Sequence, residues 1–400
     1  MNQSSNSLME TLGLYVQIPF CASKCSFCNF SSQVAPAKVF EDYVRSIERE
    51  AALFPARASH EGLRANLARF PVNTVYFGGG TPTLLGAEKL ERIFRVLRQN
   101  FNLGRVVETT LEMTPGSAPR GLLEHLSRLC VSRLSVGAQA FDDCELRSTG
   151  RLHSAADTVT QVRAARAAGF HNINLDLLAG LPHQTLASWQ RSLDALARLE
   201  PEHVSVYLFE ADEKSRLGRE ILRHGDHNGA NFVPDEDFMA RAYEAACEFL
   251  ENEGYEHYEI SNFAQPGFES IHNRRYWQRQ PYLGLGAGAH SFDGAQRWAN
   301  EKAPADYQAK LAKDELPIVE KHSVDSQAEM EEYFFLGLRE RRGVSLDYAR
   351  RRWPAPPLNG WMAAAQRLER DGLLQERGGR LRLTKRAYLL SNEVFQEFLG

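Results

Sequence analysis

The chain has 400 residues, of which 43% are hydrophobic and 24% charged, and its formal net charge at pH 7 is −4. This length predicts about two to three domains with a large buried core. The slightly acidic balance excludes a globally basic nucleic-acid surface, and no apolar stretch reaches membrane-spanning length.

The start of the chain is polar and rich in serine and asparagine. It has neither the basic region nor the apolar region of a secretory signal. We therefore expect a disordered tail over residues 1–12 and a cytoplasmic protein whose cysteines are not paired in disulfides.

Short apolar strands alternate with amphipathic helices over residues 13–232. The predicted strands are Leu14–Ile18, Thr74–Phe77, Glu108–Met113, Arg133–Val136, Asn172–Leu177 and His203–Leu208. The predicted helices between them are Val39–Leu53, Ala87–Phe101, Ala118–Leu129, Ala155–Ala168 and Leu186–Leu199. Strand–helix units in series predict an α/β fold with a parallel sheet, either doubly wound or curled into a partial (β/α)6 barrel. No Gly-x-Gly-x-x-Gly follows the first strand, and polar residues follow several strand ends, which favours the barrel.

The pattern changes after residue 232. Region 233–300 begins with a predicted helix, Asp235–Gly254, and continues as a stretch rich in glycine and aromatic residues. Glu301–Leu316 is charged and has prolines nearby, so we expect a linker there. Residues 326–400 read as a small, mainly helical domain with a hairpin around Gly378 and Gly379, which suggests a winged-helix-like module.

Three cysteines directly follow the first strand: Cys21, Cys25 and Cys28. Three thiolates can hold three irons of a 4Fe–4S cluster and leave the fourth iron open to a substrate or cofactor. No fourth cysteine follows nearby, since Phe30 occupies the place where one would stand. The alternatives are a structural zinc site, which more often has paired Cys-x2-Cys knuckles, and redox-active thiols. The remaining cysteines are isolated in the sequence: Cys130, Cys144 and Cys247.

Cys-x3-Cys-x2-Cys with an aromatic residue, Phe27, before the last cysteine resembles the signature of the radical S-adenosylmethionine (SAM) superfamily. The resemblance implies SAM at the open iron and a six-unit partial barrel. The run Gly78–Thr83 follows the second strand and taken alone is a tight turn. In the similar families this loop contacts the methionine part of SAM, which implies the same for Gly79, Gly80 and Thr81.

The resemblance implies further SAM contacts near the strand ends, at positions that match the anaerobic coproporphyrinogen III oxidase family. Taken singly, the polar ones are more typical of surface or ion-pair residues and the aromatic ones of core packing. The implied positions are Tyr15, Phe27, Glu112, Gln139, Arg151 and Asp176.

Residues 272–277 read His-Asn-Arg-Arg-Tyr-Trp and precede a glycine-rich run. His-Asn-x-x-Tyr-Trp resembles the motif of the HemW-type haem chaperones. The resemblance implies that His272 is an axial haem ligand. A histidine with a structural role in a loop is the alternative, and His290 is a weaker second candidate.

The resemblance implies a haem chaperone that binds haem, a 4Fe–4S cluster and SAM and transfers haem to an acceptor protein, such as a respiratory enzyme. An electron donor to the cluster is then a second partner, and a homodimer is compatible with the sequence. The alternative is an oxygen-independent coproporphyrinogen III dehydrogenase, a radical SAM enzyme of porphyrin biosynthesis. Those enzymes carry Cys-x-Cys at the end of the motif and a longer N-terminal segment, whereas Asn29 and Phe30 follow Cys28 here. The resemblance therefore allows SAM cleavage but argues against coproporphyrinogen dehydrogenase activity. No catalytic residue is assigned.

Overall fold

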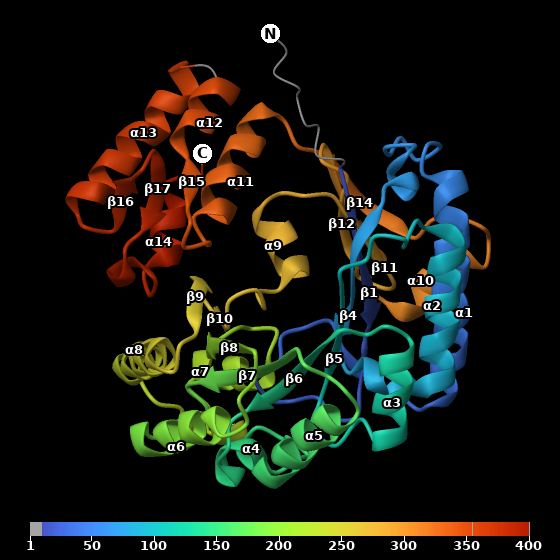
Figure 1. Cartoon of the computed structure of the whole chain (residues 1–400), viewed down its shortest axis with the longest axis horizontal. Coiled ribbons are helices and arrows are strands. Elements are labelled where there is room, and N and C mark those ends of the chain that lie inside the picture. Colours follow the sequence, from blue (N-terminus) through green and yellow to red (C-terminus); the bar gives the residue numbers. More distant parts are fainter. Residues whose placement is uncertain (1–9, 354, 400) are drawn as a thin grey trace.

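The computed structural model describes residues 10–353 and 355–399 (Figure 1). The predicted disordered tail lies outside the described residues as far as residue 9. The first strand already begins at Leu12, and Glu10 forms an ion pair with Arg64 (2.6 Å).

A parallel sheet forms the centre of the molecule and confirms all six predicted strands. Its members pair in chain order: β1 (Leu12–Ile18), β4 (Val72–Gly79), β5 (Glu108–Met113), β6 (Arg133–Gln139), β7 (Ile173–Ala179) and β8 (His203–Leu208). Each strand therefore lies beside the strand of the next unit, and the order never reverses as it does in a doubly wound sheet. The fold is the expected partial barrel, whose carboxyl-terminal strand ends meet at one mouth.

Helices cover the outer face of this sheet. They are α1 (Lys38–Arg57), α2 (Gly86–Asn100), α3 (Arg120–Arg128), α5 (Ala155–Ala167), α6 (Leu186–Ala197) and α8 (Glu236–Asn252). Two shorter helices, α4 (Asp143–Ser148) and α7 (Arg216–Leu222), instead lie beside the loop that follows β1. Helix α2 shows why they pack there: Leu90, Ile93, Phe94 and Leu97 are buried and recur at helical spacing. Capping boxes, Ser154 with Asp157 and Thr185 with Ser188, fix the starts of α5 and α6.

Additional strands extend the sheet at both edges, to twelve strands among the described residues. On one side, β10 (Asn262–Ala264) and β9 (Glu256–Glu259) follow β8 in antiparallel pairs. On the other side, β11 (Tyr282–Leu285) lies parallel to β1, and β12 (His290–Phe292), β13 (Gln296–Asn300) and β14 (Ile318–Ser323) continue antiparallel.

The prediction of a linker over Glu301–Leu316 is wrong, because this segment contains helix α10 (Pro304–Leu311). Its Tyr307 is fully buried and donates a hydrogen bond to Glu50 of α1 (2.6 Å). Pro304 stands at the first turn of the helix, where the missing N–H costs nothing. The proline that suggested a linker thus starts a packed helix.

The C-terminal region is the expected small helical module with a hairpin. It comprises α11 (Ser326–Gly337), β15 (Val344–Ser345), α12 (Leu346–Arg352), α13 (Ala355–Arg370), β16 (Leu374–Arg377), β17 (Arg380–Leu383) and α14 (Ser391–Gln396). Gly378 and Gly379 both have positive φ, 63° and 70°, as a tight hairpin turn requires. Among the described residues, no helix has the length and apolar character needed to cross a membrane.

Candidate functional site: the barrel mouth and the barrel floor

The loop after β1 brings the three clustered cysteines to the barrel mouth. Two short strands, β2 (Phe20–Cys21) and β3 (Gln33–Val34), pair in parallel and close the base of the loop. Lys24 crosses the loop and donates to the carbonyls of Phe30 (2.7 Å) and Ser32 (2.8 Å). Backbone hydrogen bonds therefore fold residues 20–34 into a compact loop, which we call the cysteine loop.

The thiol groups of this loop are unpaired and only partly shielded from solvent. Cys25 is buried, and Cys21 and Cys28 are half-buried. Burial raises the pKa of the Cys21 thiol, while hydrogen bonds with Ser32 and Thr81 lower it. Arg151 places Nη1 3.5 Å from the Cys25 Sγ, so a cation stands beside a group that is anionic when it binds metal.

The cysteine loop supplies three free thiols, the ligand type that binds the irons of a 4Fe–4S cluster. Among the described residues, no three His, Cys, Asp or Glu side chains converge on a single metal ion, as a structural zinc site requires. In a 4Fe–4S cluster each cysteine binds a different iron, so the three thiolates surround the cluster and do not meet at a single ion.

The glycine loop after β4 lies directly against the cysteine loop. The Gly80 N–H donates to the Ile18 carbonyl (2.9 Å) and the Thr81 N–H to the Phe20 carbonyl (2.7 Å). Gly79 has φ +101°, a conformation that favours glycine. A Cβ atom on Gly80 would lie 2.5 Å from the Phe20 carbonyl oxygen. This close backbone approach explains why glycine follows the strand here.

We expect Gly80→Ala to disturb the cysteine loop. The added methyl group meets backbone atoms that cannot move aside, so the free energy of unfolding should fall by about 1–3 kcal/mol. Iron content after anaerobic reconstitution should fall as well, because Phe20 adjoins Cys21. Gly121→Ala in α3 is the matched control, since a Cβ atom there meets nothing within 4 Å. Urea unfolding and iron analysis of both variants test this expectation, which equal behaviour would contradict.

Two carboxylates point into the barrel interior just below the mouth. Glu112 accepts hydrogen bonds from the Tyr76 hydroxyl (2.7 Å) and the Gly79 N–H (2.9 Å). Burial raises its pKa to about 7, although both donors lower it. Asp176 accepts from Asn174 (2.8 Å), and burial raises its pKa as well. Both oxygen acceptors therefore sit in a low-dielectric space where a ligand hydroxyl gains most from pairing with them.

The other expected SAM contacts also line the upper barrel. Gln139 ends β6 with a positive φ of 67°, and Arg151 donates to the Gly137 carbonyl. Tyr15 stacks on Tyr76 with 5.8 Å between ring centroids. Phe27, by contrast, packs against a small apolar cluster that comprises Ala140, Leu146, Leu178, Leu181, Phe209 and Leu217.

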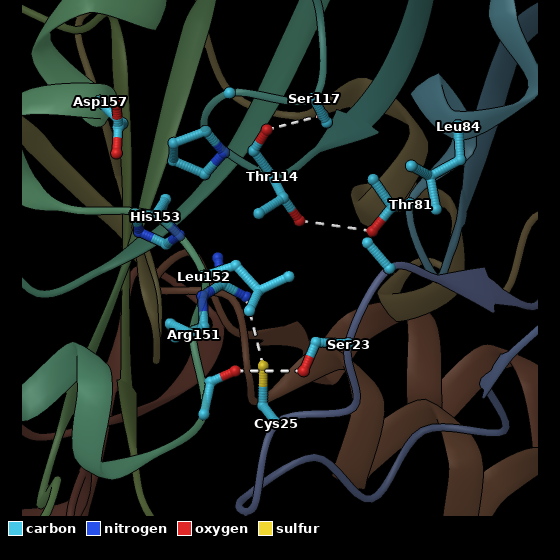
Figure 2. A pocket seen from close by; sticks show the side chains of 14 residues that line it. Ser23, Cys25, Thr81, Leu84, Thr114, Ser117, Arg151, Leu152, His153 and Asp157 are labelled. Atoms are coloured by element: carbon cyan, nitrogen blue, oxygen red, sulfur yellow. Dashed lines mark hydrogen bonds between the residues drawn. The ribbon is translucent and has the colours of Figure 1, made fainter.

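A cavity of about 370 Å³ opens at the mouth between the loops that follow β4, β5 and β6 (Figure 2). Three of the residues that the sequence assigns to the cluster or to SAM line it: Cys25, Thr81 and Arg151. Glu112, Gln139 and Asp176 are not among the residues that line this cavity. Sequence reasoning missed several polar residues of the cavity wall, among them Thr114, Ser117 and His153. Their positions in loops after strand ends were the available signal, and His153 stands only two residues after Arg151.

His272 lies at the opposite end of the barrel, on helix α9 (Ile271–Trp277). It is fully buried, with Nδ1 2.9 Å from the Thr74 hydroxyl and Nε2 2.8 Å from the Tyr276 hydroxyl. Glu108, the first residue of β5, accepts the N–H groups of Ile271 (2.9 Å) and His272 (3.0 Å). Helix α9 thus closes the barrel floor, at the amino-terminal strand ends.

Both ring nitrogens of His272 therefore already have a hydrogen-bond partner, the Thr74 hydroxyl at Nδ1 and the Tyr276 hydroxyl at Nε2. Burial and the charges of Arg275 and Arg133 lower its pKa to about 3, so the ring is neutral at pH 7. The C-terminal domain covers α9 through an ion pair between Arg274 and Glu340 (3.0 Å). His290, the weaker candidate, is exposed on β12.

Comparison with known proteins agrees with this geometry. A family model described as the radical SAM superfamily matches residues 15–227, and one described as the HemN C-terminal domain matches residues 324–390. The chain is 33% identical to the heme chaperone HemW of Bacillus subtilis (strain 168) over 390 residues, which are 96% of this chain and 98% of that protein. The chain belongs to the HemW family of radical SAM proteins.

Other matches support the same assignment. The heme chaperone HemW of Mycobacterium tuberculosis (strain H37Rv) is 33% identical over 397 residues, which are 98% of this chain and 95% of that protein. Among solved structures, coproporphyrinogen III oxidase (HemN) from Escherichia coli superposes with a TM-score of 0.84 at 23% identity, covering 98% of this chain and 91% of that chain. This last likeness concerns the fold alone.

Proposed function

We propose that this HemW-family protein is a haem chaperone that binds haem, a 4Fe–4S cluster and SAM and transfers haem to an acceptor protein. The observation that carries the proposal is full-length similarity to proteins named heme chaperone HemW, at 33% identity over 96% of the chain in the first case. An electron donor to the cluster, a respiratory enzyme as acceptor, a cytoplasmic location and a homodimer belong to the same proposal.

Cys21, Cys25 and Cys28 would each bind one iron of the cluster and leave the fourth iron for SAM. When bound, the cluster supplies electrons to SAM. The chain's own residues then orient the cofactor. Their proposed roles are ribose hydrogen bonds at Glu112 and Asp176, backbone and hydroxyl contacts at Gly79, Gly80 and Thr81, polar contacts at Gln139 and Arg151, and aromatic contacts at Tyr15 and Phe27.

Haem would bind at the barrel floor with His272 as an axial ligand. The His272 Nε2 is hydrogen-bonded to the Tyr276 hydroxyl, 2.8 Å away. This hydrogen bond must break before Nε2 can bind the haem iron. Because His272 is fully buried, this exchange requires α9 to move away from the barrel floor and from Glu340. Binding of haem at this site is therefore coupled to a conformational change.

The test uses anaerobically reconstituted protein in three assays. Haem titration followed by visible absorbance should show saturable binding, and mixing with a haem-depleted haem protein should move the haem spectrum to that acceptor. Incubation with coproporphyrinogen, SAM and a reductant should yield no protoporphyrinogen. Efficient protoporphyrinogen formation without haem transfer would overturn the proposal in favour of the dehydrogenase alternative.

A further inference from the structure

Helix α9 is held from two sides, and the residues that hold it lie on different faces of the helix. On one face, His272 and Arg275 are buried and bond to residues at or next to the starts of β1 and β4. Arg274 and Gln278 are four positions apart, which places them together on another face. Both are half-buried and contact the C-terminal region. Figure 1 shows α9 between that region and the barrel strands.

The side chain that Arg274 and Gln278 contact is Glu340, in the turn after α11. Its carboxylate accepts from the Nε of Arg274 (3.0 Å) and the amide of Gln278 (3.0 Å). Arg342 donates to it as well (2.8 Å). Glu340 is only 3% exposed, and a buried carboxylate needs such partners to offset its loss of hydration. Two of these three donors come from α9 and the residue that follows it.

The turn that carries Glu340 is itself fixed to the edge of the sheet. Its backbone forms an antiparallel bridge with Glu259, the last residue of β9. The next N–H, that of Arg341, donates to the Tyr258 carbonyl (2.9 Å). Strand β9 is the outermost strand on that side of the twelve-stranded sheet. The Glu340 carboxylate therefore holds a fixed position relative to the barrel, and α9 is clamped between this carboxylate and the barrel floor.

His272 can bind haem, as proposed above, only after α9 leaves the barrel floor. Contacts that exist only in the closed arrangement then weaken haem binding, because apparent affinity falls with the fraction of molecules whose site is open. We propose that Glu340 is a latch that holds α9 closed and thereby limits how fast and how tightly haem reaches His272. This inference rests on the proposed haem site and adds Glu340 to it as a positioning residue, not as a ligand.

Glu340→Gln tests the latch, because the amide keeps the size of the side chain and one acceptor oxygen but removes the charge. Haem association with reconstituted protein, followed by stopped-flow absorbance, should be about three- to tenfold faster, as for one net hydrogen bond lost from the closed state. The haem dissociation constant should fall by a similar factor. Arg274→Gln removes the same ion pair from the helix side and should act in the same direction.

Amide hydrogen exchange of haem-free protein gives a second measurement that does not depend on haem. Residues 271–278 should exchange faster in both variants, because α9 opens more often. Amides of β5, which exchange when the whole domain unfolds, should keep their rate. Faster exchange in both places would indicate lower global stability and would contradict a local latch.

Glu251→Gln is the matched control. Glu251 on α8 pairs with Arg341 (3.4 Å) and Lys385 (2.6 Å), so it also joins the C-terminal region to the rest of the protein. Neither ion pair involves α9. Haem association and the exchange of residues 271–278 should therefore stay as in the unmodified protein.

Two further results would overturn the inference: unchanged exchange and haem association in both Glu340→Gln and Arg274→Gln, or an equal acceleration by Glu251→Gln. The second would mean that any loosening of the C-terminal region has the same effect. A failure of the proposed function looks different. If the unmodified protein binds no haem, the haem part of that proposal fails, and the exchange of residues 271–278 still decides whether Glu340 holds α9 closed.

Discussion

Replacing Cys25 by serine should remove the iron–sulfur cluster. A serine hydroxyl is a hard, weakly acidic ligand that binds cluster iron poorly, and Cys25 supplies one of only three thiolates in the cysteine loop. Since Cys25 is the buried member of the three, no solvent ligand can easily replace it. Iron and sulfide per chain after anaerobic reconstitution should fall from about four of each to near background. The visible absorbance of the cluster should disappear with them.

Cys144→Ser provides the matched control for this experiment. Cys144 is exposed on α4 and lies outside the cysteine loop, so the same chemical change there should leave the iron content unaltered. Thermal unfolding of both variants before reconstitution separates loss of the cluster from loss of the fold. Full iron content in Cys25→Ser would contradict the assignment of this residue.

Replacing His272 by alanine should weaken haem binding at least about tenfold, as expected when an iron ligand is lost. The change is read from haem titrations of reconstituted protein. The variant also leaves the hydroxyls of Thr74 and Tyr276 without their partner, so reduced stability alone could lower binding. Alanine therefore needs a companion variant that keeps the histidine.

Tyr276→Phe is that companion. It removes the hydrogen bond that occupies the His272 Nε2 while the ring and its Thr74 contact remain. If His272 ligates haem, this variant should bind haem more tightly, by about fivefold for one neutral hydrogen bond. If His272 serves only to hold α9 in place, both variants should weaken binding or leave it unchanged. Tighter binding by Tyr276→Phe together with loss in His272→Ala is the expected pair of results.

The sequence predicted the barrel well because its signals are local. Each apolar strand and amphipathic helix shows its own periodicity, and the spacing of Cys21, Cys25 and Cys28 needs only a short loop. The edge strands β9 to β14 were missed because they are short and depend on pairing with partners distant in sequence. Pro304 was read as a break, although proline suits the first turn of a helix.

The surroundings of the candidate site residues were harder to predict. The burial of His272 depends on Thr74, Glu108 and Tyr276, which come from two different strands and a helix. Likewise, Glu340 meets Arg274 and Gln278 only because the C-terminal region folds back against α9. Sequence spacing can place such residues near strand ends, but it cannot show which hydrogen bonds are already made.

The position of α9 at the barrel floor would keep a haem bound at His272, as proposed above, apart from the cysteine loop. Thr74, which holds His272, lies five residues before Gly79 on β4, about 16 Å along the strand at roughly 3.3 Å per residue. Packed side chains such as Tyr15 and Tyr76 fill the space between. A reactive species formed at the mouth reacts only with atoms in contact with it. A porphyrin bound on the other side of Tyr15 and Tyr76 would therefore keep its propionates intact. On that proposal, the same barrel would carry a reactive cluster at its mouth and deliver an unmodified haem from its floor.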